Sequence, residues 1–266
     1  MNVVVLVAAA AVDVTKFITS SEASIQAKKT ASLLKTLNVS ALITGEIGVG
    51  KKTLASFILP DASIYDASDF DELLIALESS NELIISNIDK SPNLQRLISS
   101  IQENNVRIIA TSSQLFSNDI IDELCSIKLE LPSLRDRDED VAFLIDIFLE
   151  EAHKLFGGSK ETFSLEHINP DLSKNAHSLR RQVMINFLLE DIKDTELMDL
   201  IGNYLYDKLG SKNDYKEYLY LYEVPLIKAG INKFKSQLQL SDKLGLNRNT
   251  LRKKISDNKQ YLEKEI

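Results

Sequence analysis

One short stretch of the sequence has the residue types and spacing that bind phosphate. Gly45-Glu46-Ile47-Gly48-Val49-Gly50-Lys51 follows the apolar run 39–44 and opens a helical pattern over 51–59. Glycines let backbone N–H groups turn toward phosphate oxygens, and the N-terminus of the helix adds partial positive charge. The Lys51 amine would then reach the β- and γ-phosphates of a nucleotide. We predict a P-loop here. The alternative is a plain strand-to-helix turn, and the sequence leaves nucleotide binding open.

A second stretch, near the C-terminus, has a pattern typical of helix-turn-helix DNA binding. Over 237–255, apolar residues stand where two helices would pack together, and Gly245 stands where the turn needs a left-handed conformation. Basic and amide side chains on the second helix would face base edges and phosphates in the major groove. The alternative is an ordinary pair of basic helices. The residues that we predict to contact DNA are Ser236, Gln237, Asn247, Arg248, Asn249, Thr250, Arg252, Lys253 and Lys254.

Charge is distributed unevenly along the 266 residues. Between positions 228 and 260, nine Lys or Arg residues stand against two Asp residues, so this stretch carries +7. The whole chain carries −8, which leaves −15 for the remainder. Such an asymmetry indicates a basic module carried by an acidic body, although a solvated helical face would give the same count.

The elements expected around the phosphate loop alternate between strands and helices. Strands are predicted at 39–44, 82–88 and 106–111, and helices at 21–37, 51–59 and 94–102. Short apolar strands that alternate with helices favour a parallel sheet covered on both faces. After Pro132 the strand signals stop and only helices are predicted. The predicted fold class is therefore α/β, followed by helices and a small all-α module.

Several function classes are excluded by what the sequence lacks. Cys125 is the only cysteine, so no disulfide framework or cysteine metal site can form, which fits a reducing cytoplasm. The apolar start, 1–12, lacks a basic flank and is too short to span a bilayer, so we expect neither secretion nor a membrane partner. His153, His167 and His177 lack metal-ligand spacing, so no metal site is predicted.

Several stretches together resemble the AAA+ domain of NtrC-like, sigma-54-dependent activators. The phosphate loop with Ile43, Thr44 and Ala55 is similar to that family's loop, residues 106–111 resemble its sensor I strand, and 131–141 resemble its linker into a helical lid. The resemblance implies a P-loop AAA+ parallel sheet with a helical lid that binds ATP or ADP. Lys52 lacks the hydroxyl that usually ligates magnesium, so magnesium stays open. The residues implied to bind nucleotide are Gly45, Glu46, Gly48, Val49, Gly50, Lys51, Lys52 and the sensor II arginine, Arg180.

The C-terminal stretch 244–255, with 222–227 upstream, is very similar to the Fis-type helix-turn-helix module that ends such activators. The resemblance implies a regulator of double-stranded DNA in the bacterial nucleoid, dimeric through helices at about 216–234. Their apolar positions equally permit packing within one chain. A dimer would bind two half-sites about one DNA turn apart. The core offers a surface for a higher oligomer or another regulator.

Three departures from the family pattern concern catalysis. Ser86 and Asn87 stand where the family has the Asp and Glu of Walker B, and neither can act as a general base. Asp89 would substitute only if the strand register shifted. Ser117 and Glu123 stand where trans-acting arginines are expected, and loss of one such arginine costs on the order of 10³-fold in rate. No match to the GAFTGA loop that touches sigma-54 is found between 51 and 86.

We therefore predict a DNA-binding regulator that hydrolyses little or no ATP and does not remodel sigma-54 polymerase. The rivals are an active ATPase of the sigma-54 type and an architectural protein that bends DNA. The expected division is an AAA+-like part at 1–135, a helical lid at 136–204 and a Fis-type module at 205–266. Because the AAA+-like part begins almost at the start of the sequence, no receiver domain is expected before it.

Overall fold

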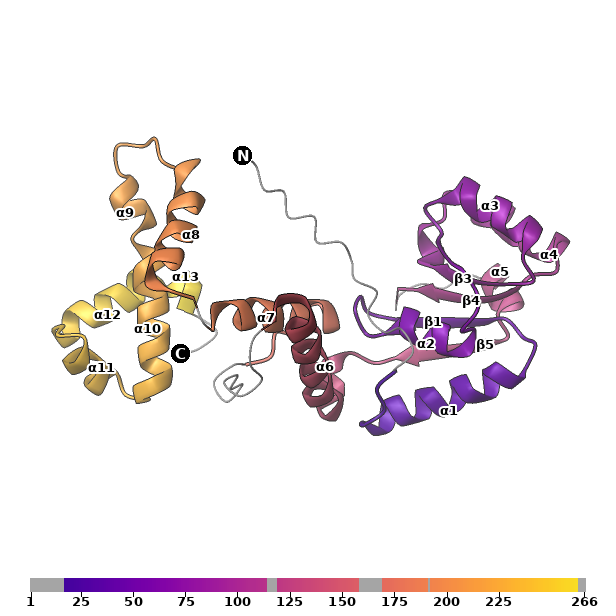
Figure 1. Ribbon diagram of the computed structural model, residues 1–266, viewed down its shortest axis with the longest axis horizontal. Helices are drawn as coiled ribbons and strands as arrows, with labels where there is room; N and C mark the ends of the chain where they lie inside the picture. The colour runs from indigo at the N-terminus through magenta and orange to yellow at the C-terminus, as the bar shows by residue number, and fades with distance from the viewer. Residues whose placement is uncertain (1–16, 114–118, 158–168, 191, 263–266) are drawn as a thin grey trace. The chain divides into compact units, whose positions relative to one another are not determined.

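The computed structural model describes residues 17–113, 119–157, 169–190 and 192–262 (Figure 1). The chain forms two compact units. The first comprises Met1–Phe163 with Asn169–Glu190, and the second comprises Ser164–Ile168 with Asp191–Ile266. The expectations for 1–12 and for Ser117 lie outside the described residues. In the described ranges, no helix combines the length and the apolar composition that crossing a bilayer requires.

A five-stranded sheet forms the centre of the first unit, in the order β2-β3-β4-β1-β5. All of its described pairings are parallel, with Leu42 of β1 opposite Ala110 of β4 and Leu83 of β3 opposite Ile108 of β4. The strands are β1 (Ala41–Gly45), β2 (Ile64–Asp66), β3 (Glu82–Ser86), β4 (Arg107–Ser112) and β5 (Ile127–Leu131). The predicted α/β parallel sheet is confirmed, although the sequence analysis did not predict β2 and β5.

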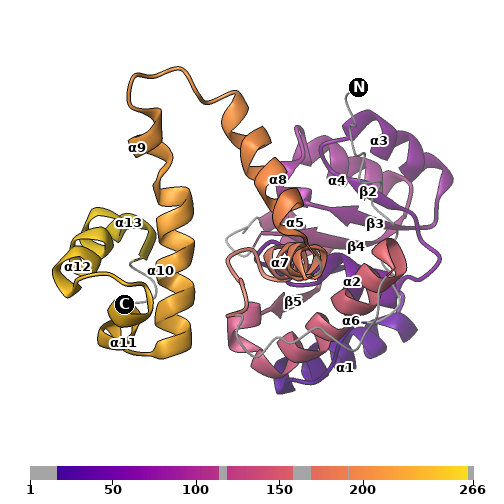
Figure 2. The same ribbon diagram turned by 60° about the vertical axis from the view of Figure 1, so that its left-hand side comes forward.

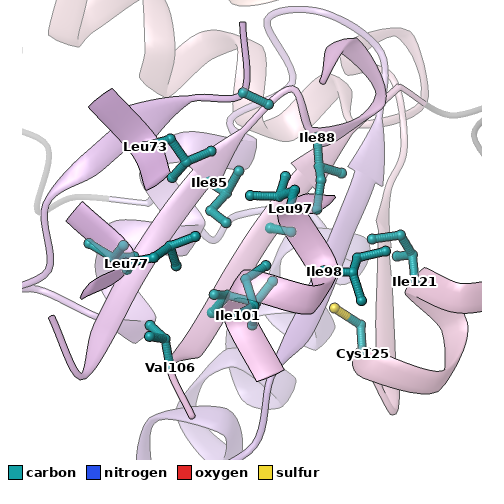
Figure 3. Close-up of a cluster of buried hydrophobic side chains, with 14 of the residues drawn as sticks. Leu73, Leu77, Ile85, Ile88, Leu97, Ile98, Ile101, Val106, Ile121 and Cys125 are labelled. Atoms are coloured by element: carbon teal, nitrogen blue, oxygen red, sulfur yellow. The ribbon is translucent and has the colours of Figure 1, made fainter. Parts of the chain in front are cut away.

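Helices cover both faces of the sheet because alternate strand residues point to opposite sides. Ile85 of β3 packs among residues of α3, α4 and α5 (Figure 3), and Leu83 belongs to the same cluster, whereas Ile84 belongs to a cluster with residues of α1 and α2. The helices are α1 (Glu22–Thr36), α2 (Lys51–Ile58), α3 (Phe70–Ser79), α4 (Leu94–Glu103) and α5 (Asp119–Leu124). Both clusters are apolar and buried, so the carboxyl ends of the strands are held at one edge of a rigid layer.

The predicted strand at 82–88 is wrong at its end. Asn87 has a left-handed backbone (φ 54°), which ends β3 at Ser86 and starts the short 3₁₀ helix η1 (Ile88–Lys90). The Ile88 side chain is fully buried in the α3–α4 cluster, so its apolar character reflects this packing and not a place in the sheet (Figure 3). A single left-handed residue therefore turns the chain at the edge where the phosphate loop lies.

The remainder of the first unit is helical, as predicted. A 3₁₀ turn, η2 (Leu134–Asp136), leads from β5 into α6 (Asp138–Phe156), and α6 packs against α7 (Ala176–Leu189). Asp138, Glu139 and Asp140 occupy the first turn of α6, where negative charge is favourable. Gly157, at φ 74°, ends the helix.

The described part of the second unit is built from helices and their connections (Figure 2). The helices are α8 (Asp194–Tyr206), α9 (Asp214–Tyr218), α10 (Tyr220–Phe234), α11 (Gln237–Lys243), α12 (Arg248–Asp257) and α13 (Lys259–Leu262). Residues of the four helices α10, α11, α12 and α13 form the core of the unit, which contains Val224, Ile227, Leu240, Leu251 and Leu262. The contacts place α8 in this unit. The division of the chain at 135 and 204 stays a prediction.

Close packing between α10 and α11 gives a test of the second unit. A Cβ atom on Gly230 would lie 2.2 Å from Cδ1 of Leu240, which is fully buried, whereas a Cβ on Gly202 of α8 would meet nothing within 4 Å. We expect Gly230→Val to lower the free energy of unfolding of this unit by about 1–3 kcal/mol through overpacking. Gly202→Val is the matched control, with an expected change within about 0.5 kcal/mol. Equal urea denaturation curves for the two variants would contradict this packing.

Candidate functional site

The phosphate loop lies where β1 ends and α2 begins, and its glycines are required by the backbone. Gly48 (φ 80°) and Gly50 (φ 103°) adopt conformations that side chains disfavour. A Cβ atom on Gly48 would lie 2.3 Å from the carbonyl oxygen of Lys174, at the start of the segment that leads into α7. The loop backbone therefore lies against that segment at a distance that only glycine permits.

Every carbonyl oxygen from Gly45 to Gly50 accepts a hydrogen bond. Lys51 Nζ donates to the carbonyls of Gly45 and Glu46, at 2.7 Å each. The other donors are Asn175 Nδ2 to Ile47 (2.9 Å), the Ala176 N–H to Gly48 (3.1 Å), Arg137 Nη2 to Val49 (2.8 Å) and the Leu54 N–H to Gly50 (3.0 Å). Residues of α2, together with Arg137 before α6 and Asn175 and Ala176 at the start of α7, thus fix the orientation of these carbonyl groups.

Three N–H groups of the same loop have no such partner. Among the described residues, the backbone N–H groups of Ile47, Gly48 and Gly50 donate to no protein acceptor outside regular helices and strands, whereas Glu46 adjoins the β1–β5 pairing and Val49 closes the turn at 47–48. Successive free N–H groups in a loop with left-handed residues form an anion-binding nest, and α2 adds the positive end of its dipole. The loop is therefore arranged to accept a phosphate oxygen.

Asn175 connects the loop to the rest of the unit. Its side chain donates to Glu46 Oε2 and to the carbonyl of Ile47, both at 2.9 Å, and accepts from the Leu134 N–H at 2.7 Å. The residue is 1% exposed and combines a positive φ of 51° with a ψ of −131°, a backbone conformation outside the left-handed helical region. Sequence reasoning missed Asn175 because its partners lie 41 to 129 residues away and leave no local pattern.

Arg137 supports the loop from a second direction. Besides its bond to Val49, Arg137 forms an ion pair with Asp140 Oδ2 (3.5 Å) inside the fold, where each side chain is at most 3% exposed. Asp140 also accepts hydrogen bonds from Ser20, Ser21 and Ser24 at the start of α1. Burial lowers the pKa of Arg137 and the Asp140 carboxylate opposes this change, so the guanidinium stays charged beside the loop.

Positive charge gathers around the loop. Burial lowers the pKa of Lys51, and the carboxylates of Asp89 and Glu46 partly oppose this change. Burial also lowers the pKa of His177, and so do the nearby charges of Lys51, Arg180, Lys52 and Lys174. His177 was not among the predicted site residues, and its position at the start of α7 is visible only in the fold. An anion bound here would be stabilised by these cations.

Arg180 is brought to the same region but is engaged elsewhere. Its Nε and Nη2 atoms donate to the two carboxylate oxygens of Glu151 on α6, at 2.8 and 2.6 Å. These bonds raise the pKa of Arg180. A contact of Arg180 with nucleotide stays a prediction and would require exchange of this bidentate pair. Lys52 is exposed in the first turn of α2.

The residues aligned with Walker B point to a neighbouring strand. Ser86 Oγ and Asn87 Nδ2 donate to Asp66 Oδ2 at the end of β2, at 3.0 and 2.5 Å. Burial opposes the change, but hydrogen bonds from Ser68, Asn87 and Ser86 lower the pKa of Asp66 to about 2. Asp66 was missed because a three-residue edge strand gives little signal in the sequence. Its carboxylate is already satisfied by these donors.

Asp89, two residues beyond this pair, has a different environment. Its Oδ1 atom is buried without a hydrogen-bond partner in the described part of the chain. The described residues contain no cluster of three or more His, Cys, Asp or Glu side chains able to hold a metal ion. A single hard carboxylate oxygen beside a phosphate loop fits magnesium, because Mg²⁺ is commonly held by one or two carboxylates together with nucleotide phosphates.

The helix-turn-helix pattern folds as two capped helices joined by Gly245, at φ 63°. Ser236 Oγ accepts from the Gln239 N–H (3.4 Å) at the start of α11, and Asn247 Oδ1 accepts from the Asn249 N–H (2.9 Å) at the start of α12. Leu240 of α11 and Leu251 of α12 are buried against α10, which holds the two helices together.

Most of the side chains predicted to contact DNA are exposed on this scaffold. The exposed ones are Gln237, Asn247, Arg248, Asn249, Thr250, Arg252 and Lys253, and Ser236 is half-buried as a cap. Lys254 differs because its amine pairs with Glu223 of α10, whose carboxylate also accepts from Asn258. In this arrangement Lys254 links α12 to α10, and five exposed residues, 248–250, 252 and 253, form the outward side of α12.

Asn175 allows a direct test of how the loop is held. Asn175→Ala would leave groups of Glu46, Ile47 and Leu134 without a partner, at about 1–3 kcal/mol for each buried group. Asn105→Ala is the matched control, because Asn105 also has a positive φ (52°) but is exposed. We expect Asn175→Ala to lower the free energy of unfolding by at least about 2 kcal/mol more than the control. Equal losses in chemical denaturation would contradict the assigned bonds.

Comparison with known proteins places this geometry in context. No model of a protein family matches the sequence. The DNA-binding transcriptional regulator NtrC of Azospirillum brasilense is 27% identical over 197 residues, covering 57% of this chain and 41% of that protein. This chain therefore spans about two fifths of the length of that curated relative.

Solved structures of NtrX from Brucella abortus share the fold. The complex with ADP matches with a TM-score of 0.57 and the complex with ATP with 0.58, each at 18% identity and covering 91% of this chain and 69% of NtrX. Likeness at this level of identity shows the P-loop AAA+ fold. The 27% sequence identity to NtrC agrees with this shared fold.

Proposed function

We propose that this chain is a DNA-binding transcription regulator whose AAA+ domain binds ATP or ADP with little or no hydrolysis. The observation that carries the proposal is the exposed cationic side of α12 on a capped and buried helix-turn-helix scaffold. Residues at the N-terminal end of such a helix face base edges, and later basic residues reach phosphates. Arg248 and Asn249 would accordingly read bases, and Arg252 and Lys253 would contact the backbone.

Nucleotide binding is supported by the loop itself. Its free N–H groups, the half-buried Lys51 amine and the surrounding cations suit a di- or triphosphate. NtrX, whose fold this chain shares, has been solved with ADP and with ATP. In this proposal the nucleotide contacts comprise Gly45–Gly50, Lys51 and Lys52, with Arg180 joining when it leaves Glu151.

Weak hydrolysis is supported by the end of β3. Ser86 and Asn87 both donate to Asp66, so neither is available to activate water at the loop. The Glu123 position adds no positive charge for a transition state. With no match to the sigma-54-contacting loop, we propose a regulator that acts without remodelling sigma-54 polymerase, in the cytoplasm at the nucleoid.

A homodimer through the second unit is supported by α8, none of whose residues is buried within one chain. Its large apolar side chains are between 40% and 81% exposed: Leu197, Met198, Leu200, Ile201, Tyr204 and Tyr206. A contiguous apolar helix face of this kind is typical of an association surface. Pairing of two copies would present two α12 helices to successive half-sites on duplex DNA.

DNA binding predicts a specific salt dependence. We expect Arg252→Gln in the full chain to weaken binding to a 30-base-pair duplex about ten-fold and to reduce the slope of log affinity against log salt by about one, because one phosphate contact is lost. Lys212→Gln removes an equally exposed charge of the second unit outside the helix-turn-helix and serves as the control. Fluorescence anisotropy at several salt concentrations measures both values, and unchanged binding by Arg252→Gln would refute the assignment of α12.

Nucleotide binding and hydrolysis are separable in one set of measurements. We expect ADP to bind the wild-type chain in calorimetry and to bind Lys51→Ala at least about ten-fold more weakly, because the charge beside the phosphates is lost. Lys29→Ala, which removes an exposed lysine of α1, is expected to bind like wild type. The rate of phosphate release from ATP by the wild-type chain should stay near the rate measured for Lys51→Ala. Robust release by wild type that Lys51→Ala abolishes would establish the rival ATPase instead.

A further inference from the structure

We propose that the Asp89 carboxylate ligates the divalent cation of a bound nucleotide, in a role that Ser86 and Asn87 cannot fill. The inference rests on the proposed nucleotide binding and adds to it a named cation ligand. It concerns the edge of the sheet where β1 and β3 end, beside Lys51.

The backbone after β3 gives Asp89 its position without any shift of strand register. The pairing of β3 with β4 is regular, with Leu83 opposite Ile108 and Ile85 opposite Ala110. The left-handed Asn87 then turns the chain, and its N–H donates to Thr111 Oγ1 of β4 at 3.2 Å. The turn is closed by the Lys90 N–H to the Asn87 carbonyl at 2.8 Å. Asp89 is thus held in a short, hydrogen-bonded turn.

Packing fixes which side chains of this turn face the core. Ile88 is fully buried among residues of α3 and α4, as Figure 3 shows. Ser86 and Asn87 are committed to Asp66 on the β2 side. Asp89 is half-buried and lies within electrostatic range of Lys51, although no ion pair within 4 Å joins these two described residues.

One oxygen of the Asp89 carboxylate lacks a hydrogen-bond partner among the described residues. Its Oδ1 atom is inaccessible to solvent and has no hydrogen-bond partner in the described part of the chain. A buried carboxylate oxygen without a donor is unfavourable, and a cation would satisfy it. The other carboxylates at this edge are engaged, because Glu46 accepts from Asn175 and Asp66 accepts from Ser68, Ser86 and Asn87. Asp89 is therefore the carboxylate suited to a new ligand here.

A single carboxylate is expected to bind Mg²⁺ only when the phosphates of a nucleotide supply further oxygen ligands. Mg²⁺ takes oxygen ligands and usually keeps several waters while one or two carboxylates and nucleotide phosphates complete its shell. The described residues hold no cluster of three metal-ligating side chains, so Asp89 alone gives no stable site. Without a cation, the negative Asp89 carboxylate would repel the phosphates. With Mg²⁺ bound between them, the carboxylate would hold the cation that attracts the phosphates. The effect of Asp89 on nucleotide affinity therefore depends on Mg²⁺.

The test measures ADP affinity of the full chain by calorimetry, in excess EDTA and in millimolar Mg²⁺. We expect Mg²⁺ to raise the affinity of wild type about ten-fold or more, and Asp89→Asn to abolish this gain while binding in EDTA stays equal or becomes tighter. Asp61→Asn, an exposed carboxylate in the loop after α2, should keep the full gain. Asp89→Glu, which retains a carboxylate, should keep part of it. Thermal melts by circular dichroism verify that each variant is folded.

Each outcome decides between distinct claims. A Mg²⁺ gain that persists in Asp89→Asn, or the lack of any gain in wild type that still binds ADP, overturns the role of Asp89 and leaves nucleotide binding intact. Failure of wild type to bind ADP under both conditions refutes the proposed nucleotide binding and the cation site with it. Should Asp89→Asn fail to fold, electron paramagnetic resonance of Mn²⁺ with ADP on wild type and Asp89→Glu decides, because the proposal requires bound Mn²⁺ in wild type and less in the variant.

Discussion

The hydrogen bonds that hold the phosphate-loop carbonyls in place are the constraint on which the first unit depends. Three of the donors, Arg137, Asn175 and Ala176, lie 88 to 128 residues beyond the carbonyls that they bond. Because the C=O and N–H groups of successive loop peptides share one backbone, fixing the carbonyls leaves three N–H groups of the loop for an anion. In the proposed function the nest therefore depends on tertiary structure, because three of its carbonyls are bonded by Arg137, Asn175 and Ala176.

Two concentrations of positive charge serve different purposes in an acidic chain. Around the phosphate loop, Lys51, Lys52, Lys174 and Arg180 are close enough to lower the pKa of His177, and they act at short range on a bound anion. On α12 the cations are exposed and act across water, where screening limits their reach to about 8–10 Å. Arg137 also lies beside the loop, where it is paired with Asp140 and donates to Val49. The net charge of −8 therefore says little about either site.

The sequence predicted those features whose signals are local. The glycines of the loop, the left-handed Gly245 and the buried strands all follow from residue types at fixed spacing, and the structure has these features at those places. β2 was missed because a three-residue strand gives almost no periodicity, whereas β5 was overlooked although Ile127, Leu129 and Leu131 alternate with charged residues. The end of β3 was misplaced because Ile88 is apolar. Its side chain packs against α3 and α4 and is not part of the strand.

The parts of the site that escaped prediction are all long-range. The residues next to Asn175 in the sequence form no pattern that predicts its hydrogen bonds to Glu46, Ile47 and Leu134. Arg180 was placed by resemblance, and its bidentate pair with Glu151 depends on how α6 packs on α7. Likewise the position of Asp89 depends on a single left-handed residue, Asn87, whose conformation no local pattern specifies.

The central claim is that the loop, with its carbonyls held by Arg137, Asn175 and Ala176, is a nucleotide site. Hydrogen exchange of the full chain, followed by mass spectrometry with and without ADP, tests it most directly. Bound phosphates would engage the free N–H groups, so slower exchange is expected in peptides covering 45–52, together with the supporting segments at 134–140 and 174–180. Unchanged exchange in the loop at saturating ADP, or protection confined to other segments, would contradict the account.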